Sequence, residues 1–210
     1  MSLLNRKILF VHINKSCGGV ITTNFKNNGN TELTGFHRTL LDLLNESQKL
    51  GVINNNLYIF TIVRNPWERM LSLYLFYKYK FFSKEFFSGS PNIDDYFNKW
   101  INYIYSKEFD RSRIHSKVNV FNYCFSNQLN WVKDENGKLI KNINIFKKEE
   151  LDYDDLFENI LKLQNFDSKT IIHPTNHSHY SNYYDEESKE LVRKHYAEDI
   201  DYFGYKFENE

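Results

Sequence analysis

The chain of 210 residues has few of the features that mark several protein classes. It holds only two cysteines, Cys17 and Cys124, which excludes a fold built on a disulfide framework. No apolar run approaches the roughly 20 residues that a membrane-spanning helix needs, and the opening MSLLNRK lacks the apolar core of a signal peptide. No linker rich in Pro, Gly or Ser divides the chain, so we expect a single domain over residues 1–210.

An excess of charge of either sign is also missing. The chain has 27 Lys and Arg residues and 27 Asp and Glu residues, so its formal net charge is zero. This balance argues against bulk binding of nucleic acid, and an anionic ligand has to meet a local group of basic side chains. No set of potential ligands has the spacing of a zinc or iron site, so we expect no metal.

The most informative segment of the chain is KILFVHINKSCGGVI, residues 7–21. The apolar run 8–13 predicts a buried strand, and the residues from Val20 onward can begin a helix. The turn between them carries Lys15, a hydroxyl group and two glycines, the components of a phosphate site at a helix N-terminus. The lysine precedes the glycines, so the turn lacks the spacing of an ATP or GTP loop.

A second segment, LYIFTIVRNPWER at 57–69, repeats the step from a buried strand to a helix. Asn65 is suited to the N-cap and Pro66 to the first helical position. Arg64 is therefore expected at the strand tip, at the same edge of the sheet as Lys15. Its guanidinium can bind a phosphate through two hydrogen bonds, and Ser72 follows two turns into the helix.

The remaining patterns complete an expected α/β fold, a three-layer P-loop-like domain with a mostly parallel sheet. Further strands are expected at 143–146 and 170–172, and helices at 39–49, 93–105, 153–163 and 186–196. The aromatic segment 74–87 fits either a core helix or a platform on which a sugar ring could stack. Asn136 and Gly137 predict a hairpin turn.

The two segments with phosphate-site features together resemble the cofactor loops of sulfotransferases that use 3'-phosphoadenosine-5'-phosphosulfate (PAPS). KSCGGVI and RNPWERMLS are similar to the loops of carbohydrate sulfotransferases typified by heparan sulfate 2-O-sulfotransferase and its bacterial relatives. In that family, the loop commonly written HIPKTAGTS binds the 5'-phosphosulfate, and RNPxxRxxS binds the 3'-phosphate through its Arg and Ser. The segments GFHRTLLD at 35–42 and DIDYFGY near the C-terminus extend the resemblance over nearly the whole chain.

The resemblance implies a role for each matching residue. His37 is the candidate general base, and Lys15 is expected to stabilise the leaving phosphate; Asp42 is a candidate to orient His37. The candidates for cofactor binding are Lys15, Ser16, Cys17, Gly18, Gly19, Val20, Arg64 and Ser72. Gly19 and Val20 stand where the family has Thr and Ser, so backbone N–H groups are expected to make more of that contact.

Fewer residues of the sequence indicate where the acceptor binds. Gln128 and His115 are candidates for binding the acceptor, and a plain surface position is an equally good interpretation of His115. The expected acceptor is a hydroxyl group, most simply on a carbohydrate, and no nucleic acid or membrane partner is expected.

Two other functions are compatible with the same residues. One is a nucleotide-dependent kinase with a divergent phosphate loop, which would need Mg²⁺ and a carboxylate near the turn. The other is a nucleotide-binding homologue without turnover. Eukaryotic members of the family are Golgi membrane proteins, so the missing anchor predicts a cytoplasmic bacterial enzyme or an excised domain. The oligomeric state is not readable from the sequence.

Overall fold

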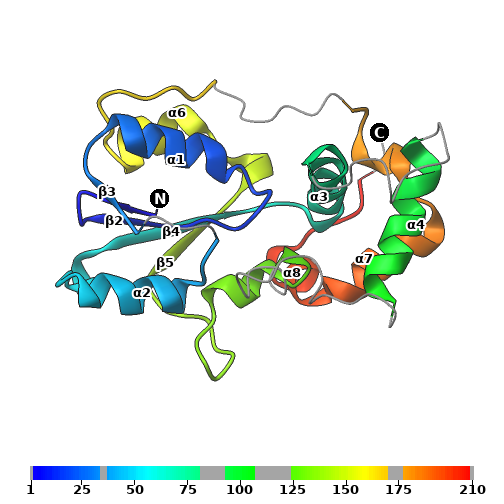
Figure 1. Cartoon of the computed structure of the whole chain (residues 1–210), viewed down its shortest axis with the longest axis horizontal. Helices are drawn as coiled ribbons and strands as arrows, with labels where there is room; N and C mark the ends of the chain where they lie inside the picture. Colours follow the sequence, from blue (N-terminus) through cyan, green and yellow to red (C-terminus); the bar gives the residue numbers. More distant parts are fainter. Residues whose placement is uncertain (1, 34–36, 81–92, 107–123, 170–176, 209–210) are drawn as a thin grey trace. The chain divides into compact units, whose positions relative to one another are not determined.

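The computed structural model (Figure 1) describes residues 2–33, 37–80, 93–106, 124–169 and 177–208. Its contacts divide the chain into two compact units. The first unit contains Met1–Arg64 and Asn122–Pro174, and the second contains Asn65–Phe121 and Thr175–Glu210. Each unit has its own set of helices, and the first contains the sheet.

The first unit alternates strands and helices, as the sequence predicts. In chain order its elements are β1 (Leu3–Leu4), β2 (Ile8–Val11), α1 (Gly18–Asn27), β3 (Thr31–Glu32), α2 (Leu40–Lys49), η1 (Asn54–Asn56), β4 (Tyr58–Val63), η3 (Gln128–Val132), β5 (Ile143–Lys147), η4 (Lys148–Glu150), α6 (Tyr153–Asp155) and the π-helical turn η5 (Leu156–Ile160). The expected helix at 153–163 is therefore a short α-helix followed by a π turn. The expected strand at 170–172 lies outside the described residues.

The sheet is mixed, with strand order β3-β1-β2-β4-β5. β2 pairs with β4 and β4 with β5 in parallel, while β1 runs antiparallel to both β2 and β3. The expectation of a mostly parallel sheet is thus not confirmed. Only β1 runs against the other strands, because β3 is antiparallel to β1 and therefore has the direction of β2, β4 and β5. β2 and β4 are the long apolar runs of the sequence, whereas β1 and β3 contain two residues each.

A tight turn adds β1 to the sheet. Asn5 and Arg6 have positive φ angles of 49° and 54°, and Leu4 pairs with Ile8 directly across the turn. The N–H of Lys7 donates to the carbonyl of Leu4 (3.0 Å), so Asn5 and Arg6 are the central residues of a β-turn with the two positive φ angles of type I′, and Lys7 is an additional residue before the pair. Two residues of β1 are enough to bury Leu3 and Leu4, which are at most 1% exposed.

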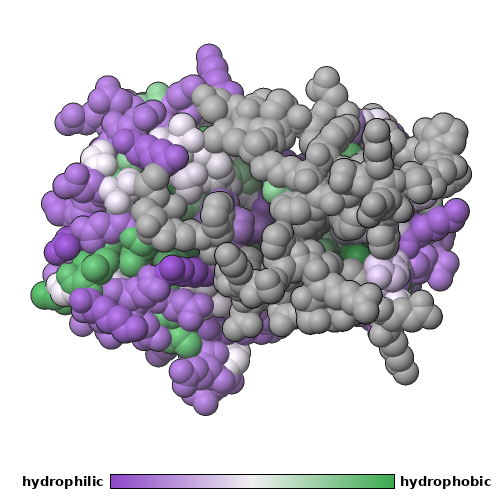
Figure 2. All heavy atoms as spheres, viewed as in Figure 1, coloured by the Kyte–Doolittle hydropathy of each residue, from purple (hydrophilic) through white to green (hydrophobic). Residues whose placement is uncertain are grey.

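The core of the first unit lies between the sheet and α1. Phe10 and Phe60, on adjacent strands, pack with ring centroids 4.9 Å apart, and Phe25 of α1 meets both rings edge-on. Leu156 and Phe157 of η5 belong to the same buried cluster. In Figure 1, α1 and α6 lie over one face of the sheet and α2 lies over the other. Figure 2 shows mainly hydrophilic side chains on the visible, described surface of the first unit, at the left of the view, with a smaller hydrophobic area near the left edge.

Asn24 of α1 and Asn28, the C-cap residue of the same helix, fasten α1 to the segment after η5. The Asn24 amide donates to the carbonyl of Asp167 (2.9 Å) and accepts from its N–H (2.7 Å). One turn later, the Asn28 amide bonds in the same way to the backbone of Asn165. A side-chain amide that both donates and accepts in this way takes the place of a neighbouring strand. It provides hydrogen-bond partners for the backbone N–H and C=O groups of an irregular segment.

The second unit is helical in its described part. Its elements are α3 (Pro66–Lys80), α4 (Ile93–Tyr105), η6 (Tyr180–Tyr183), α7 (Glu186–His195) and α8 (Ala197–Phe203). The Asn65 side chain accepts from the N–H of Trp67 (3.1 Å) at the start of α3, as its predicted N-cap position requires. Among the described residues, no helix has both the length and the apolar character that crossing a bilayer requires.

Aromatic side chains form the core of the second unit. Tyr74 of α3 is fully buried and packs on Phe97 and Trp100 of α4, with ring centroids 5.3 and 5.4 Å apart. Tyr184 meets Phe97 edge-on at 4.7 Å. For Tyr74, the core interpretation of the aromatic segment is therefore correct, whereas its residues from 81 onward lie outside the described part.

Candidate active site

The parallel pairing of β2 and β4 determines where the two predicted loops lie. Val11 pairs with Thr61, so both strands end at the same edge of the sheet. The Thr61 hydroxyl also donates to the carbonyl of Val11 (2.8 Å), which fixes this register where the first loop begins. Because parallel strands bring their carboxyl ends together, the loop at 12–17 and Arg64 emerge side by side.

The first loop has the backbone of an anion-binding turn. Lys15 and Cys17 have positive φ angles of 62° and 58°, a conformation that costs a non-glycine residue roughly 1–3 kcal/mol. Such turns direct successive N–H groups into one concavity. The loop leads into α1, whose first turn contains no acidic residue and receives no hydrogen bond from the side chain of Cys17 at the N-cap. The helix N-terminus is thus suited to an anion.

Arg64 and Gln128 connect this loop to the tip of β4. The Arg64 guanidinium donates from Nη1 to the carbonyl of Lys15 (3.1 Å). The side chain of Gln128 accepts from the Arg64 N–H (2.9 Å) and donates to the Arg64 carbonyl (2.8 Å). Its Oε1 also accepts from the Ser16 hydroxyl (3.1 Å). The structure therefore brings together four of the predicted site residues, Lys15, Ser16, Arg64 and Gln128.

Gly18 provides space for a histidine ring. A Cβ atom at this position would lie 1.9 Å from Cδ2 of His12. The φ angle of Gly18 is not positive, so the position requires a glycine for space and not for backbone conformation. The His12 ring stacks on Phe10 with centroids 5.6 Å apart.

His37 approaches the first loop from the segment before α2. Its Nδ1 lies 3.0 Å from the carbonyl oxygen of His12, and the two imidazole centroids are 4.4 Å apart. The Trp131 ring also meets His37 edge-on, with ring centroids 6.1 Å apart. Since a carbonyl oxygen can only accept, Nδ1 of His37 carries the proton, and in the neutral ring Nε2 is the basic nitrogen.

The predicted partner of His37 has another contact. The Asp42 carboxylate accepts from the hydroxyl of Thr39 (2.7 Å), and the N–H of Asp42 donates to the same hydroxyl as part of the N-cap of α2. The contact that orients His37 in the structure is the carbonyl of His12. Asp42 instead stabilises the start of the helix that follows His37.

Tyr153 is a residue beside the loop that the sequence does not single out. It begins α6, immediately after the N-cap residue Asp152, and packs against the buried core cluster of the first unit. Burial raises the pKa of its phenol, the adjacent Cys17 thiol raises this pKa further, and the nearby Arg64 guanidinium lowers it. Tyr153 thus contributes a neutral hydroxyl group beside Cys17.

The other predicted site residues are distributed over the chain. Gly19 and Val20 lie half-buried in the first turn of α1. Ser72 lies in α3 in the second unit and is 6% exposed, and its role stays a prediction. His115 lies outside the described residues. In the described ranges, no group of three or more His, Cys, Asp or Glu side chains gathers as a metal site would.

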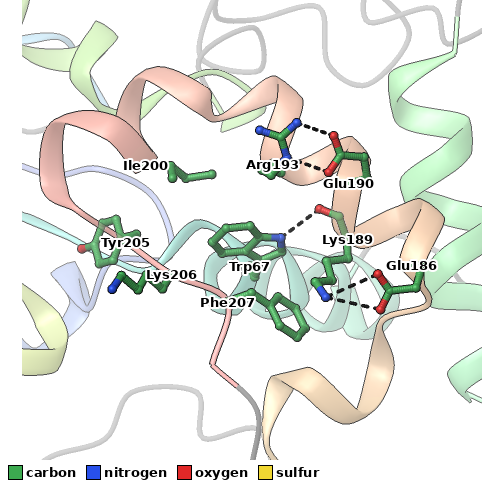
Figure 3. Close-up of a pocket in the computed structure, with 9 residues that line it drawn as sticks. All are labelled: Trp67, Glu186, Lys189, Glu190, Arg193, Ile200, Tyr205, Lys206 and Phe207. Atoms are coloured by element: carbon green, nitrogen blue, oxygen red, sulfur yellow. Dashed lines mark hydrogen bonds and ion pairs between the residues drawn. The ribbon is translucent and has the colours of Figure 1, made fainter.

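The second unit contains a cavity of about 290 Å³ near the C-terminal segment (Figure 3). Trp67 and Phe207 meet edge-on in it at 5.5 Å, and the Lys189 ammonium lies 4.7 Å from the centre of the Phe207 ring. Trp67 Nε1 donates to the carbonyl of Lys189 (3.0 Å). These contacts join the last residues of the chain to α3 and α7.

Comparison with known proteins identifies the family. A sequence model described as "Sulfotransferase family" matches residues 4–206, nearly the whole chain. The chain belongs to the sulfotransferase family. No curated protein and no solved structure gave a match. Family membership makes the protein a transferase of sulfuryl groups, and the matched range contains the first loop, Arg64, Ser72 and Gln128.

The fit between Gly18 and His12 can be tested by a double-mutant cycle. Gly18→Ala should lower the free energy of unfolding by about 1–3 kcal/mol, because the new methyl group must displace the His12 ring or the loop. The measurement is urea unfolding of both single variants and the double variant. In the His12→Ala background the same change should cost much less, because the ring is gone. Strictly additive costs would contradict the proposed contact.

His12 should make the stability of this sulfotransferase depend on pH. Burial lowers the pKa of His12 well below its usual 6.5, and the neighbouring His37 and Lys15 add to the effect. The unfolded chain therefore binds this proton more readily than the folded protein. The contribution of His12 to stability is complete above pH 6.5 and is lost as the pH falls below it, by at most about 1.4 kcal/mol per pH unit.

The measurement is urea unfolding of the wild type and His12→Gln at pH 7.5, 6.5 and 5.5. The other histidines and the carboxylates titrate in both proteins, so the difference between them isolates His12. The wild type should lose more stability than the variant between pH 6.5 and 5.5. Equal losses would show that His12 titrates alike in the folded and unfolded chains.

Proposed function

We propose that this member of the sulfotransferase family transfers a sulfuryl group from PAPS to a hydroxyl group of a carbohydrate. The observation that supports the proposal best is the connection between the two loops. Lys15 and Arg64 are 49 positions apart in the chain, yet the guanidinium of one bonds to the carbonyl of the other. Two cationic residues that are connected in this way suit a ligand that carries more than one phosphate group.

The residues of the first unit fit such a cofactor. The N-terminus of α1, without an acidic residue in its first turn, and the backbone of 15–20 would hold the 5'-phosphosulfate. Lys15 would neutralise charge on the leaving phosphate. Arg64 would hold the 3'-phosphate, and the role of Ser72 stays a prediction. A guanidinium has five N–H donors, so its bond to the Lys15 carbonyl is compatible with a two-point contact to a phosphate.

His37 is the proposed general base. When bound, PAPS supplies the sulfuryl group, and its phosphate is the leaving group. The acceptor hydroxyl becomes a better nucleophile as its proton passes to Nε2 of His37, since Nδ1 is committed to the carbonyl of His12. The Trp131 ring restricts the position of the imidazole, so the basic nitrogen is oriented before the acceptor binds.

The fold of the first unit and the division of the chain into domains are part of the same proposal. We infer that the first unit is a P-loop-like three-layer structure, supported by the helices on both faces of its sheet in Figure 1. We also infer that both units belong to one catalytic domain, because the family match runs through both. Family membership favours sulfuryl transfer over the kinase alternative.

The direct test is incubation with PAPS and a panel of glycans, with mass spectrometry of sulfated products and of released 3'-phosphoadenosine-5'-phosphate (PAP). Calorimetry with PAP and with ATP·Mg²⁺ accompanies it. Binding of PAP with sulfation of a glycan supports the proposal. Binding of PAP without any transfer would favour a nucleotide-binding homologue that has lost turnover, and binding of ATP·Mg²⁺ alone would overturn the proposal.

Arg64→Ala should weaken PAP binding by about 1.5–3 kcal/mol, or roughly 10- to 150-fold in Kd, because a charge-assisted hydrogen bond is lost. Calorimetry with PAP measures the change. Arg193→Ala is the matched control, because Arg193 is an exposed arginine that pairs with Glu190 on α7 and should leave Kd unchanged. An Arg64→Ala variant with the affinity of the wild type would remove Arg64 from the cofactor site.

His37→Asn should reduce turnover by ~10²–10⁴-fold while PAP affinity stays near that of the wild type. The amide nitrogen of Asn can take the place of Nδ1 and keep the bond to the His12 carbonyl, but the variant has no basic nitrogen. Steady-state sulfation and PAP calorimetry separate the two effects. Turnover at the wild-type rate would end the role of His37 as base.

A further inference from the structure

We propose that Gln128 is a positioning residue that locks the first loop to the tip of β4 and thereby prepares both for the cofactor. The predicted effect of Gln128 on the affinity for PAP rests on the proposed function. It differs from the expectation that Gln128 binds the acceptor, because it assigns the residue to the frame of the cofactor site.

The three contacts of the Gln128 amide support this assignment. Oε1 accepts from the N–H of Arg64 (2.9 Å) and Nε2 donates to the carbonyl of Arg64 (2.8 Å). These are the two bonds that a residue on a neighbouring strand would make. The last pair of β4 with β5 is Val63 with Lys147, so Arg64 lies one position beyond the sheet. Gln128 therefore extends the pairing of β4 by one residue, with a side chain in place of a strand.

The third contact joins this extension to the first loop. The hydroxyl of Ser16 donates to the same Oε1 (3.1 Å), from a loop residue 112 positions away in the chain. Ser16 is 1% exposed and Gln128 is fully buried. A buried polar group that loses its protein partner cannot form a hydrogen bond to water instead, which costs free energy. The Gln128 amide therefore holds both loops through hydrogen bonds that solvent cannot replace.

The bond between Arg64 and Lys15 completes the frame. The guanidinium of Arg64 donates to the carbonyl of Lys15, next to Ser16, while the backbone of Arg64 is held by Gln128. The backbone positions of both cationic residues therefore depend on one buried amide. Loss of the amide should loosen the loops relative to each other and weaken the binding of a ligand that needs both, although Gln128 itself touches no phosphate.

Two variants of Gln128 test the inference. Gln128→Met keeps the length of the side chain and removes all three hydrogen bonds. Gln128→Glu keeps the acceptor oxygens and removes the donor to the Arg64 carbonyl, so it serves if the Met variant does not fold. Ser47→Ala is the control, because Ser47 is also fully buried in the first unit and its hydroxyl bonds to Asn54 and Leu44, away from both loops.

The first measurement is hydrogen exchange by mass spectrometry without any ligand. Gln128→Met should raise exchange at least tenfold in peptides covering 12–20 and around Arg64, and Ser47→Ala should not. The second is calorimetry with PAP, where Gln128→Met should raise Kd at least tenfold, Gln128→Glu should raise it less, and Ser47→Ala should leave it unchanged. The KM for the acceptor at saturating PAPS should stay within twofold.

The outcomes separate the inference from the proposed function. Unchanged loop exchange in a folded Gln128 variant overturns the inference, whatever happens to PAP. A higher acceptor KM with unchanged Kd for PAP also overturns it and makes Gln128 an acceptor-binding residue. If the wild type does not bind PAP, the proposed function fails, and the exchange measurement alone then decides whether Gln128 locks the loops.

Discussion

The parallel alignment of β2 with β4 is the constraint on which the rest of the site depends. It places two strand ends at one edge of the sheet, so a lysine loop and an arginine that are distant in the chain become neighbours. The Thr61 hydroxyl fixes the alignment at its last pair, and the buried phenylalanines of both strands hold it from one face. The direct bond between the loops, from the Arg64 guanidinium to the Lys15 carbonyl, depends on this pairing.

Much of this arrangement could be predicted because its signals are local. Continuous apolar runs predict β2 and β4, and the sequence Asn65-Pro66 predicts where α3 begins. The family could also be recognised from the order of its motifs, which the match over residues 4–206 confirms.

What could not be predicted depends on contacts between distant residues or on unusual turns. β1 was missed because its turn uses Asn5 and Arg6, without the glycine that normally indicates a type I′ hairpin. The partners of Gln128 lie 64 and 112 positions away, and nothing in its neighbourhood indicates them. His37 is likewise oriented by a backbone carbonyl. Every residue has this group, so the sequence does not indicate which one His37 bonds to.

The left-handed backbone at Lys15 and Cys17 constrains how this loop could be redesigned. Glycine adopts such angles without steric strain, so either position could take a glycine and keep the course of the main chain. An ammonium and a thiol are retained there against a conformational preference. In a library that varies these two positions, glycine variants should keep the turn and lose only the ammonium or the thiol. Variants with other side chains should also lose the conformation of the turn, so the two effects can be told apart.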